Sequence, residues 1–440
     1  MTDAKGVDVR TDSKITAAAL LAAAACGDAQ AWRLDYTLEA GVLHSDNINL
    51  SPVDPVREDV LVPRIDLGLT HAGARVNVDI GAALEYRRYL DDTYGSEFRG
   101  TFDGRVNWLL LPERLTWTFA DNLGLYPVSL RAPDVPGNLQ QTNVFSTGPT
   151  LRFRFTPSLQ GQAEARWSDA HAEQTGAFDS SRVSGAFRLL HDFSTTRHLS
   201  GNLEVEDVDF DDDLLGDDYR RYSAYAGYTQ SLARIDLDAA LGYSRLEFDR
   251  GGDASGPLLR TSLDWRATDR STFGFGATWR YSDAATSLAE GGAAFDTGLE
   301  GVGVGGALIT PDVFRERRFD ASYLYQGVRL NLASTAYAAR FRYERDELVD
   351  ADRNEVGLGL TLGYLLRPLM TLGLAGEATR RSFIDSDSTD RDYRYGVYFT
   401  HQFARRWSWR ADLSRYERHG GAGVDSFDEN ALYLRLIYTR

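Results

Sequence analysis

The chain lacks the features that mark disulfide-linked proteins and helical membrane proteins. Its single cysteine, Cys26, lies in the N-terminal segment, so a mature chain that starts after that segment has no thiol and no disulfide. No run of about 18 or more apolar residues follows the N-terminal segment, which excludes membrane-spanning helices. A protein that crosses a membrane without such helices satisfies its backbone hydrogen bonds by closing a sheet.

Catalytic motifs are missing as well. The sequence has no Gly-x-Ser-x-Gly elbow, no His-Glu-x-x-His pair and no phosphate loop, and its seven histidines are scattered. The formal net charge of −16 and the lack of a basic patch argue against a nucleic-acid partner. The acidic run from Asp207 to Asp218 does not match the calcium loop, so we interpret it as a solvated loop, with divalent-cation binding as the alternative. We predict no enzyme, no cofactor and no metal site.

What the sequence does have is strict alternation, clearest from Phe98 to Leu110. Every second residue there is apolar or Gly, and the residues between them are polar, apart from Leu109. Because side chains on a strand alternate between faces, this stretch predicts a strand with one apolar and one polar face. The run is long for a soluble two-sheet sandwich, and Trp and Phe cluster beside short turns such as the one at Pro112. We therefore predict a transmembrane β-barrel, with the sandwich as the alternative.

The same unit recurs to the end of the chain, with short and long connections in alternation. Short connections are predicted near residues 71, 112, 157, 195, 232, 269, 327, 367 and 405. Long connections are predicted near residues 50, 93, 134, 174, 214, 253, 298, 349, 387 and 421. Nine turns and ten loops join 20 strands, so residues 32–440 are predicted to form one all-β domain. The expected fold is a single antiparallel up-and-down barrel of about 20 strands with long extracellular loops, with 18 and 22 strands as alternatives.

The first 31 residues predict a secretory signal peptide. Lys14 precedes the apolar run Ile15 to Ala25, and Ala29-Gln30-Ala31 fits a small-x-small cleavage site. Cleavage near Ala31 leaves Trp32 as the mature start, while a lipoprotein signal ending at Cys26 is the alternative. A secreted chain that forms a barrel is expected in the outer membrane of a Gram-negative bacterium.

The polar faces of the strands carry charges of both signs. As structure these side chains form cross-strand pairs, and as function they line a hydrated path for a polar solute. The candidate lumen-lining residues are Arg99, Asp103, Arg105, Glu204, Glu206, Arg260, Asp264 and Arg266. Few large aromatic residues are expected on this parity, with Tyr398 and Tyr433 as exceptions, so a slide of stacked rings for sugars is not predicted.

Residues 284–310 form a connection that is longer than the others and rich in Gly and Ala. A lumen formed by 20 strands is wide enough to leak, because barrels of about 16–18 strands already leave a water channel. We predict that this segment folds into the mouth and narrows it. The candidate constriction residues are Gly291, Gly292, Phe295, Gly301, Gly303 and Gly305. The alternative is that Val302 to Ile309 extends a strand above the membrane.

Two stretches carry a family resemblance. Ala40 to Leu50 is a first strand that ends in an Asp-Asn-aliphatic-x-Leu signature, and Pro311 to Arg318 precedes the aromatic strand Phe319 to Tyr325 and the turn at Gly327. With the length and the pattern, the mature chain resembles the outer-membrane β-barrel porins associated with bacterial exopolysaccharide systems, including those beside PEP-CTERM sorting loci.

The resemblance implies a pore that takes part in exopolysaccharide secretion. Composition and periodicity predict only an outer-membrane pore or scaffold, so a general diffusion porin for small polar solutes and a non-conducting surface scaffold or adhesin are the alternatives. The expected partners are outer-membrane lipid, a polysaccharide or small polar solutes, the barrel-assembly machinery and periplasmic export components.

Overall fold

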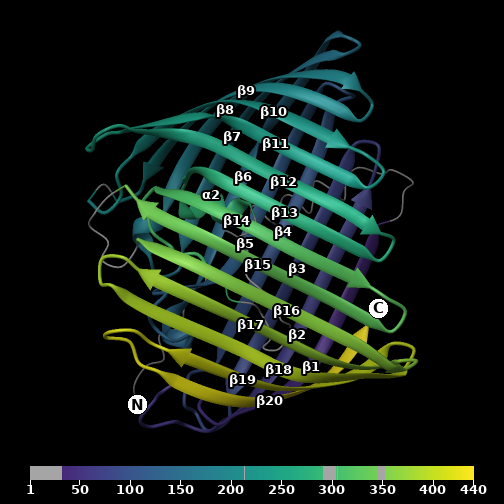
Figure 1. Ribbon diagram of the computed structural model, residues 1–440, viewed down its shortest axis with the longest axis vertical. Coiled ribbons are helices and arrows are strands. Elements are labelled where there is room, and N and C mark those ends of the chain that lie inside the picture. Colours follow the sequence, from purple (N-terminus) through teal and green to yellow (C-terminus); the bar gives the residue numbers. More distant parts are fainter. Residues whose placement is uncertain (1–31, 213, 291–303, 305, 345–351) are drawn as a thin grey trace, which may run out of the picture.

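A computed structural model describes residues 32–440 except 213, 291–303, 305 and 345–351, so the predicted signal peptide lies outside the described residues. Twenty antiparallel strands pair in sequence order, and β1 pairs with β20 to close the sheet into one barrel (Figure 1). The strands are β1 Arg33–Ser45, β2 Glu58–Ala72, β3 Val76–Tyr89, β4 Glu97–Leu111, β5 Leu115–Pro127, β6 Leu139–Thr156, β7 Leu159–Ala172, β8 Ser180–Ser194, β9 Arg197–Phe210, β10 Tyr219–Ser231, β11 Ile235–Phe248, β12 Ala254–Thr268, β13 Ser271–Ser282, β14 Phe314–Gln326, β15 Leu330–Tyr343, β16 Arg353–Arg367, β17 Met370–Phe383, β18 Ser388–Ala404, β19 Trp407–His419 and β20 Phe427–Thr439. The prediction of a 20-stranded up-and-down barrel is confirmed.

Alternation divides each strand between the outside and the inside of the wall. On β3 and β4 the outward side chains of Leu84 and Phe98 are 47% and 64% exposed. Their inward neighbours Glu85 and Arg99 are 0% and 6% exposed, because inward side chains pack on one another and form ion pairs. The period of two that is visible in the sequence therefore determines which side chains face the interior.

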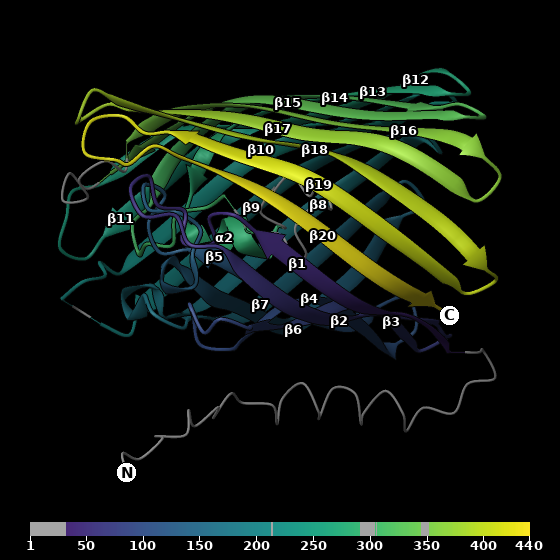
Figure 2. The ribbon, with the colours of Figure 1, turned by 90° about the horizontal axis from the view of Figure 1, so that it is seen from below.

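The connections differ sharply between the two ends of the barrel. At one end, the short-turn end, nine connections of two or three residues join the strands. At the other, the long-loop end, ten longer connections do so, and the longest is 283–313. Residue 32 and the C-terminus both lie at the short-turn end (Figure 2). One short helix, α2 (Ala284–Ala289), follows β13. Among the described residues no helix is long and apolar enough to cross a membrane.

The first stretch that carries the family resemblance closes the seam of the barrel. The carboxylate of Asp46 accepts hydrogen bonds from the backbone N–H and the side-chain amide of Asn430, at 2.7 and 2.8 Å. The side chain of Asn47 donates to the carbonyl of Asp428 at 2.8 Å. These bonds tie the end of β1 to the beginning of β20, so the Asp-Asn signature has a structural role in this chain.

Candidate pore and its inward-folded segments

The interior wall is lined by paired charges. On the side formed by β16 to β19, Arg381 Nη1 lies 2.9 Å from Asp392, and Arg418 Nε lies 2.5 Å from the same carboxylate. On the opposite side, the guanidinium of Arg188 bridges Glu164 and Glu204 at 2.8 and 3.0 Å. In these pairs each buried or half-buried charge has a partner of opposite sign, which offsets the cost of removing it from bulk water.

The structure places all eight candidate lining residues on the inward parity, but it does not bring them together. Arg99 pairs with Glu97 at 2.7 Å, and Arg266 pairs with Asp236 at 2.5 Å. Arg260 lies over the ring of Tyr225, 5.3 Å from its centroid. Of the remaining five residues, two form ion pairs and three form none with the part of the chain that the structure describes.

Among those five, Glu204 binds Arg188, and Glu206 binds Arg221. Asp103, Arg105 and Asp264 are exposed to the interior. That a solute passes along these side chains stays a prediction.

A polar recess lies on the inner wall of β3 to β7. Its volume is about 570 Å³, and it includes Arg105 from the candidate set. Other residues that line it are Asn77, Asn107, Thr118, Glu164 and Arg166. Amides, hydroxyls and guanidinium groups give this part of the lumen hydrogen-bond donors and acceptors for a polar solute.

The β5–β6 loop, residues 128–138, crosses the interior, a feature that sequence reasoning missed. Six strands separate β5 from β18 on the shorter way round the sheet, yet the loop docks on β18 and β19. Asp134 Oδ2 lies 2.6 Å from Arg394 Nη2, and Arg418 Nη1 donates to the carbonyl of Ala132 at 2.7 Å. The guanidinium of Arg131 lies 5.3 Å from the ring centroid of Phe383. The loop therefore spans a chord of the barrel.

The loop keeps its shape through Asn138. Its side-chain amide donates to the carbonyls of Ser129 and Pro133 at 2.9 and 3.1 Å, and its Oδ1 accepts from the backbone N–H of Ser129 at 2.9 Å. Val135 packs against the buried cluster of Leu50, Tyr416 and Phe427. A loop tied to itself and packed on the far wall is an obstacle with a defined position.

A second crossing begins where β13 ends. Asp283 Oδ1 lies 2.8 Å from the guanidinium of Arg182 on β8, and Asp283 Oδ2 accepts a hydrogen bond of 2.9 Å from the hydroxyl of Tyr219 on β10. Burial alone would raise the pKa of the Asp283 carboxyl, but the nearby guanidinium groups of Arg182 and Arg221 hold that pKa well below its usual range. The ionised carboxylate also caps α2 through the N–H of Thr286. Asp283 therefore fixes the start of the helix against β8 and β10.

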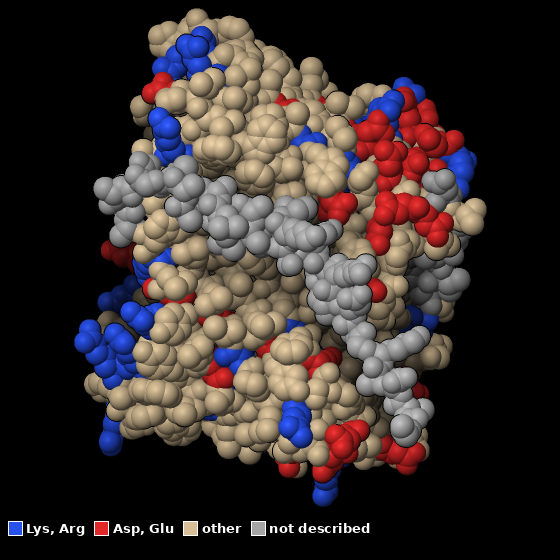
Figure 3. Space-filling model, turned by 180° about the vertical axis from the view of Figure 1, so that it is seen from behind, with Lys and Arg blue, Asp and Glu red and all other residues tan. Residues whose placement is uncertain are grey.

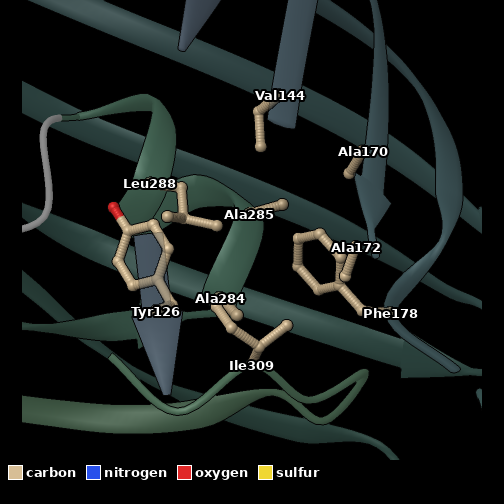
Figure 4. Close-up of a cluster of buried hydrophobic side chains, with 9 residues drawn as sticks. All are labelled: Tyr126, Val144, Ala170, Ala172, Phe178, Ala284, Ala285, Leu288 and Ile309. Atoms are coloured by element: carbon tan, nitrogen blue, oxygen red, sulfur yellow. The ribbon is translucent and has the colours of Figure 1, made fainter. Parts of the chain in front are cut away.

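Helix α2 packs on the wall formed by β5 to β7, seven strands away from β13. Figure 4 shows Ala284, Ala285 and Leu288 of the helix together with side chains of that wall and with Ile309, which returns from the described end of the connection. The wall contributes Tyr126, Val144, Ala170, Ala172 and Phe178 to this cluster. The two described ends of the connection 283–313 thus lie inside the barrel, as Figure 2 shows for α2.

That residues 284–310 narrow the mouth stays a prediction, since the structure shows only that the described ends of the segment lie inside the barrel. The candidate constriction residues Gly291, Gly292, Phe295, Gly301, Gly303 and Gly305 all lie outside the described residues. The alternative, that Val302 to Ile309 extends a strand, is wrong for the described part: residues 306–309 form no strand, and Val304 makes only an isolated parallel bridge to Leu125. The apolar contacts of Leu288 and Ile309 favour packing on the wall instead.

The expectation of few inward aromatic residues was wrong. Many aromatic rings have the inward parity, and several lie beneath guanidinium groups: Arg394 lies 4.2 Å from the ring centroid of Tyr416, and Arg318 lies 4.2 Å from that of Tyr337. The two exceptions that the sequence analysis named, Tyr398 and Tyr433, are covered in the same way by Arg410 and Arg435. These rings are covered by guanidinium groups of the chain itself. Whether any of them stacks on a sugar is not tested by these contacts, so the absence of a row of sugar-stacking rings stays a prediction.

No protein-family model matches the chain, and no curated protein matches it by sequence. Solved structures with a similar fold include the siderophore receptor PirA from Acinetobacter baumannii, with 11% identity, 93% of this chain and 80% of that chain covered, and a TM-score of 0.48. The outer membrane protein opdK from Pseudomonas aeruginosa is 13% identical, with 93% and 99% of the two chains covered and a TM-score of 0.37. Similarities of this size assign neither a family nor a function.

Proposed function

We propose that the chain is an outer-membrane pore for polar solutes in a Gram-negative bacterium. The observation that carries the proposal is the contrast between the two faces of one closed wall. Val356, Leu358 and Leu360 on the outside of β16 are 55%, 52% and 44% exposed, as lipid contact requires, while Glu355 on the inside is 6% exposed and pairs with Arg353. Outer-membrane barrels have short turns on the periplasmic side and long loops on the outer side. We therefore propose that the short-turn end faces the periplasm and the long-loop end faces the outside.

The two segments that fold into the interior narrow the path through this wide barrel and so give it a means of selecting solutes. Barrels of about 16–18 strands leave an aqueous channel, and those of about 22 strands hold a plug. This chain has 20 strands, with the β5–β6 loop and the segment around α2 inside the wall. We infer that the open path passes between these two obstacles and the polar recess.

A finer proposal is that the solute is an exopolysaccharide on its way to the surface. Its support is the resemblance of Ala40 to Leu50 and of Pro311 to Arg318 to porins of exopolysaccharide systems. Deletion of the gene, followed by an assay of surface polysaccharide, tests it. Loss of the polymer, restored by the intact gene, is the expected result. Unchanged polymer together with a conducting protein would leave a general diffusion porin.

Conductance separates a pore from the third possibility, a surface scaffold. Purified chain inserted into a planar bilayer should give discrete single-channel steps. Folded protein that inserts without steps would contradict the pore and leave the scaffold.

A further inference from the structure

Arg residues occur at every connection of the short-turn end. Each of the nine short connections has an Arg within it or within three residues of it, and all of these side chains are exposed. One such Arg is taken for each connection, and the set, called the Arg collar below, is Arg75, Arg114, Arg154, Arg197, Arg234, Arg270, Arg329, Arg367 and Arg405. Arg266, which pairs with Asp236, and Arg406 lie at two of the same turns and are not counted in the collar. No lysine contributes, because both lysines of the chain precede residue 32.

The collar has almost no neutralising partners. None of its nine guanidinium groups forms an ion pair with another described residue, whereas inward arginines such as Arg381 and Arg418 are paired. Within the short turns themselves the only acidic residues are Glu113 and Asp269. A chain of formal net charge −16 thus concentrates unpaired positive charge at one end. In Figure 3 the short-turn end is on the left, where basic side chains are seen, and an acidic cluster lies toward the long-loop end on the right.

Large apolar side chains stand beside the collar. Phe155 and Phe193 are 58% and 62% exposed, and Val328 and Phe403 are 79% and 53% exposed. Each is within four residues of a collar Arg, and Leu111, Leu232 and Leu369 repeat the pattern at three further turns. Seven of the nine turns therefore combine an exposed cation with an exposed apolar residue.

We propose that the Arg collar binds the phosphate groups of anionic phospholipids in the periplasmic leaflet, which rests on the outer-membrane location proposed above. A guanidinium fork binds phosphate in a bidentate manner, and an Arg beside an apolar residue reaches the headgroup while its neighbour enters the acyl region. Short turns recur after every second strand, so the collar follows the whole circumference, as a surrounding leaflet does. Arg154 shares the inward parity of Arg152 on β6, so it lies at the inner edge of the collar. An acidic protein that docks on the barrel would contact only one part of the circumference, so cations at all nine turns favour lipid over such a partner.

The test uses the full mature chain in vesicles of phosphatidylcholine, with or without phosphatidylglycerol. The midpoint of thermal unfolding, followed by heat-modifiable migration, should rise with phosphatidylglycerol for the wild type. The triple variant R234Q/R270Q/R329Q removes three of nine cations and should lose about a third of that rise. The matched variant R234K/R270K/R329K keeps the charge and should retain most of it, which separates charge from folding.

Two further variants change the charge in the opposite direction. Glu113→Gln and Asp269→Asn remove the two acidic residues of the short turns. In these variants phosphatidylglycerol should raise the unfolding midpoint by more than it does in the wild type. A wild-type midpoint that is indifferent to phosphatidylglycerol would overturn the proposal. So would an equal rise in the wild type and the Gln triple variant. Conductance in phosphatidylcholine alone tests the pore separately, because a conducting protein without a lipid effect rejects the collar and leaves the pore.

Discussion

Asp134 and Arg394 are 260 residues apart in the sequence, and their side chains form an ion pair of 2.6 Å inside the barrel. The two groups are 21% and 20% exposed, so water screens the pair only in part. The contact fixes the β5–β6 loop on the wall formed by β18 and β19, and makes the loop part of the lumen.

Breaking this pair should loosen the loop. We expect Asp134→Asn to cost about 1 kcal/mol of docking free energy, which populates the undocked loop about five-fold more. Single-channel recordings should then show a higher mean conductance and more open-channel noise. Arg394→Gln should have at least as large an effect, because Arg394 also contacts Glu377 and the ring of Tyr416. The double variant should add little to the effect of Arg394→Gln, because the pair with Asp134 is already lost. Asp264→Asn, an inward carboxylate with no loop contact, serves as the control; an equal change there would refute the role of the pair.

Removing the anchor of α2 should have a larger effect. Asp283→Asn leaves Arg182, 5% exposed, without its charge partner, and breaking such a buried pair costs about 3–5 kcal/mol. We expect higher conductance and a lower unfolding temperature. Asp253→Asn breaks the exposed pair with Arg245 at the long-loop end and should leave both quantities unchanged. Wild-type conductance in the Asp283 variant would show that α2 does not restrict the path.

The same anchor predicts how the pore responds to acid. The pKa of Asp283 is lowered in the folded chain. A carboxyl of this kind stabilises the fold above its unfolded pKa of about 3.9, and its contribution is lost only as the pH falls toward the folded value. Because Asp283 stays ionised over this range, its titration should cause no change in conductance between pH 7 and about pH 4. A step in conductance near pH 6 that Asp283→Asn abolishes would contradict the assignment.

The outward parity is tested by two adjacent positions on β16. Leu360 faces outward, and an Arg at the middle of a lipid-facing strand costs about 2–4 kcal/mol, so Leu360→Arg should reduce the heat-modifiable folded form. Thr361 has the inward parity, opposite Ala333 and Ala375, and Thr361→Arg should be tolerated better. Equal losses in the two variants would show that the register is wrong.

Ion selectivity should follow the acidic outer end. Without residues 1–31, which hold four acidic and three basic side chains, the formal net charge is −15. Acidic loops concentrate cations at the mouth, and salt weakens the effect because the Debye length falls from about 30 Å at 0.01 M to about 10 Å at 0.1 M. Reversal potentials at low salt should show cation preference, and an anion preference would contradict the expectation.

The sequence predicted the wall of the barrel because alternation is local. Phe98 and Arg99 face opposite sides whatever the rest of the chain does, and short turns separate strands visibly. The crossing of the β5–β6 loop could not be predicted in this way. Its position depends on Arg394 and Tyr416, which lie far along the chain and become neighbours only when the sheet closes.

The sequence does contain one signal for the two segments that cross the interior. Near the long-loop end the inward parity of several strands is apolar, as at Val60, Val62 and Val208, which are 0%, 1% and 0% exposed. Water in an open lumen would not favour such residues, so apolar side chains on the inward parity indicate that loops cover them. The inward aromatic residues, among them Tyr416 and Tyr433, follow from the same alternation.

The central claim is that the barrel conducts and that the segment around α2 restricts the path. Single-channel recording of the wild type and of a variant that lacks residues 284–310 tests it most directly, with heat-modifiable migration as the control for folding. We predict discrete steps for the wild type, and larger steps with increased antibiotic sensitivity for the deletion. A folded deletion variant with wild-type conductance would contradict the restriction, and a folded wild type without steps would contradict the pore.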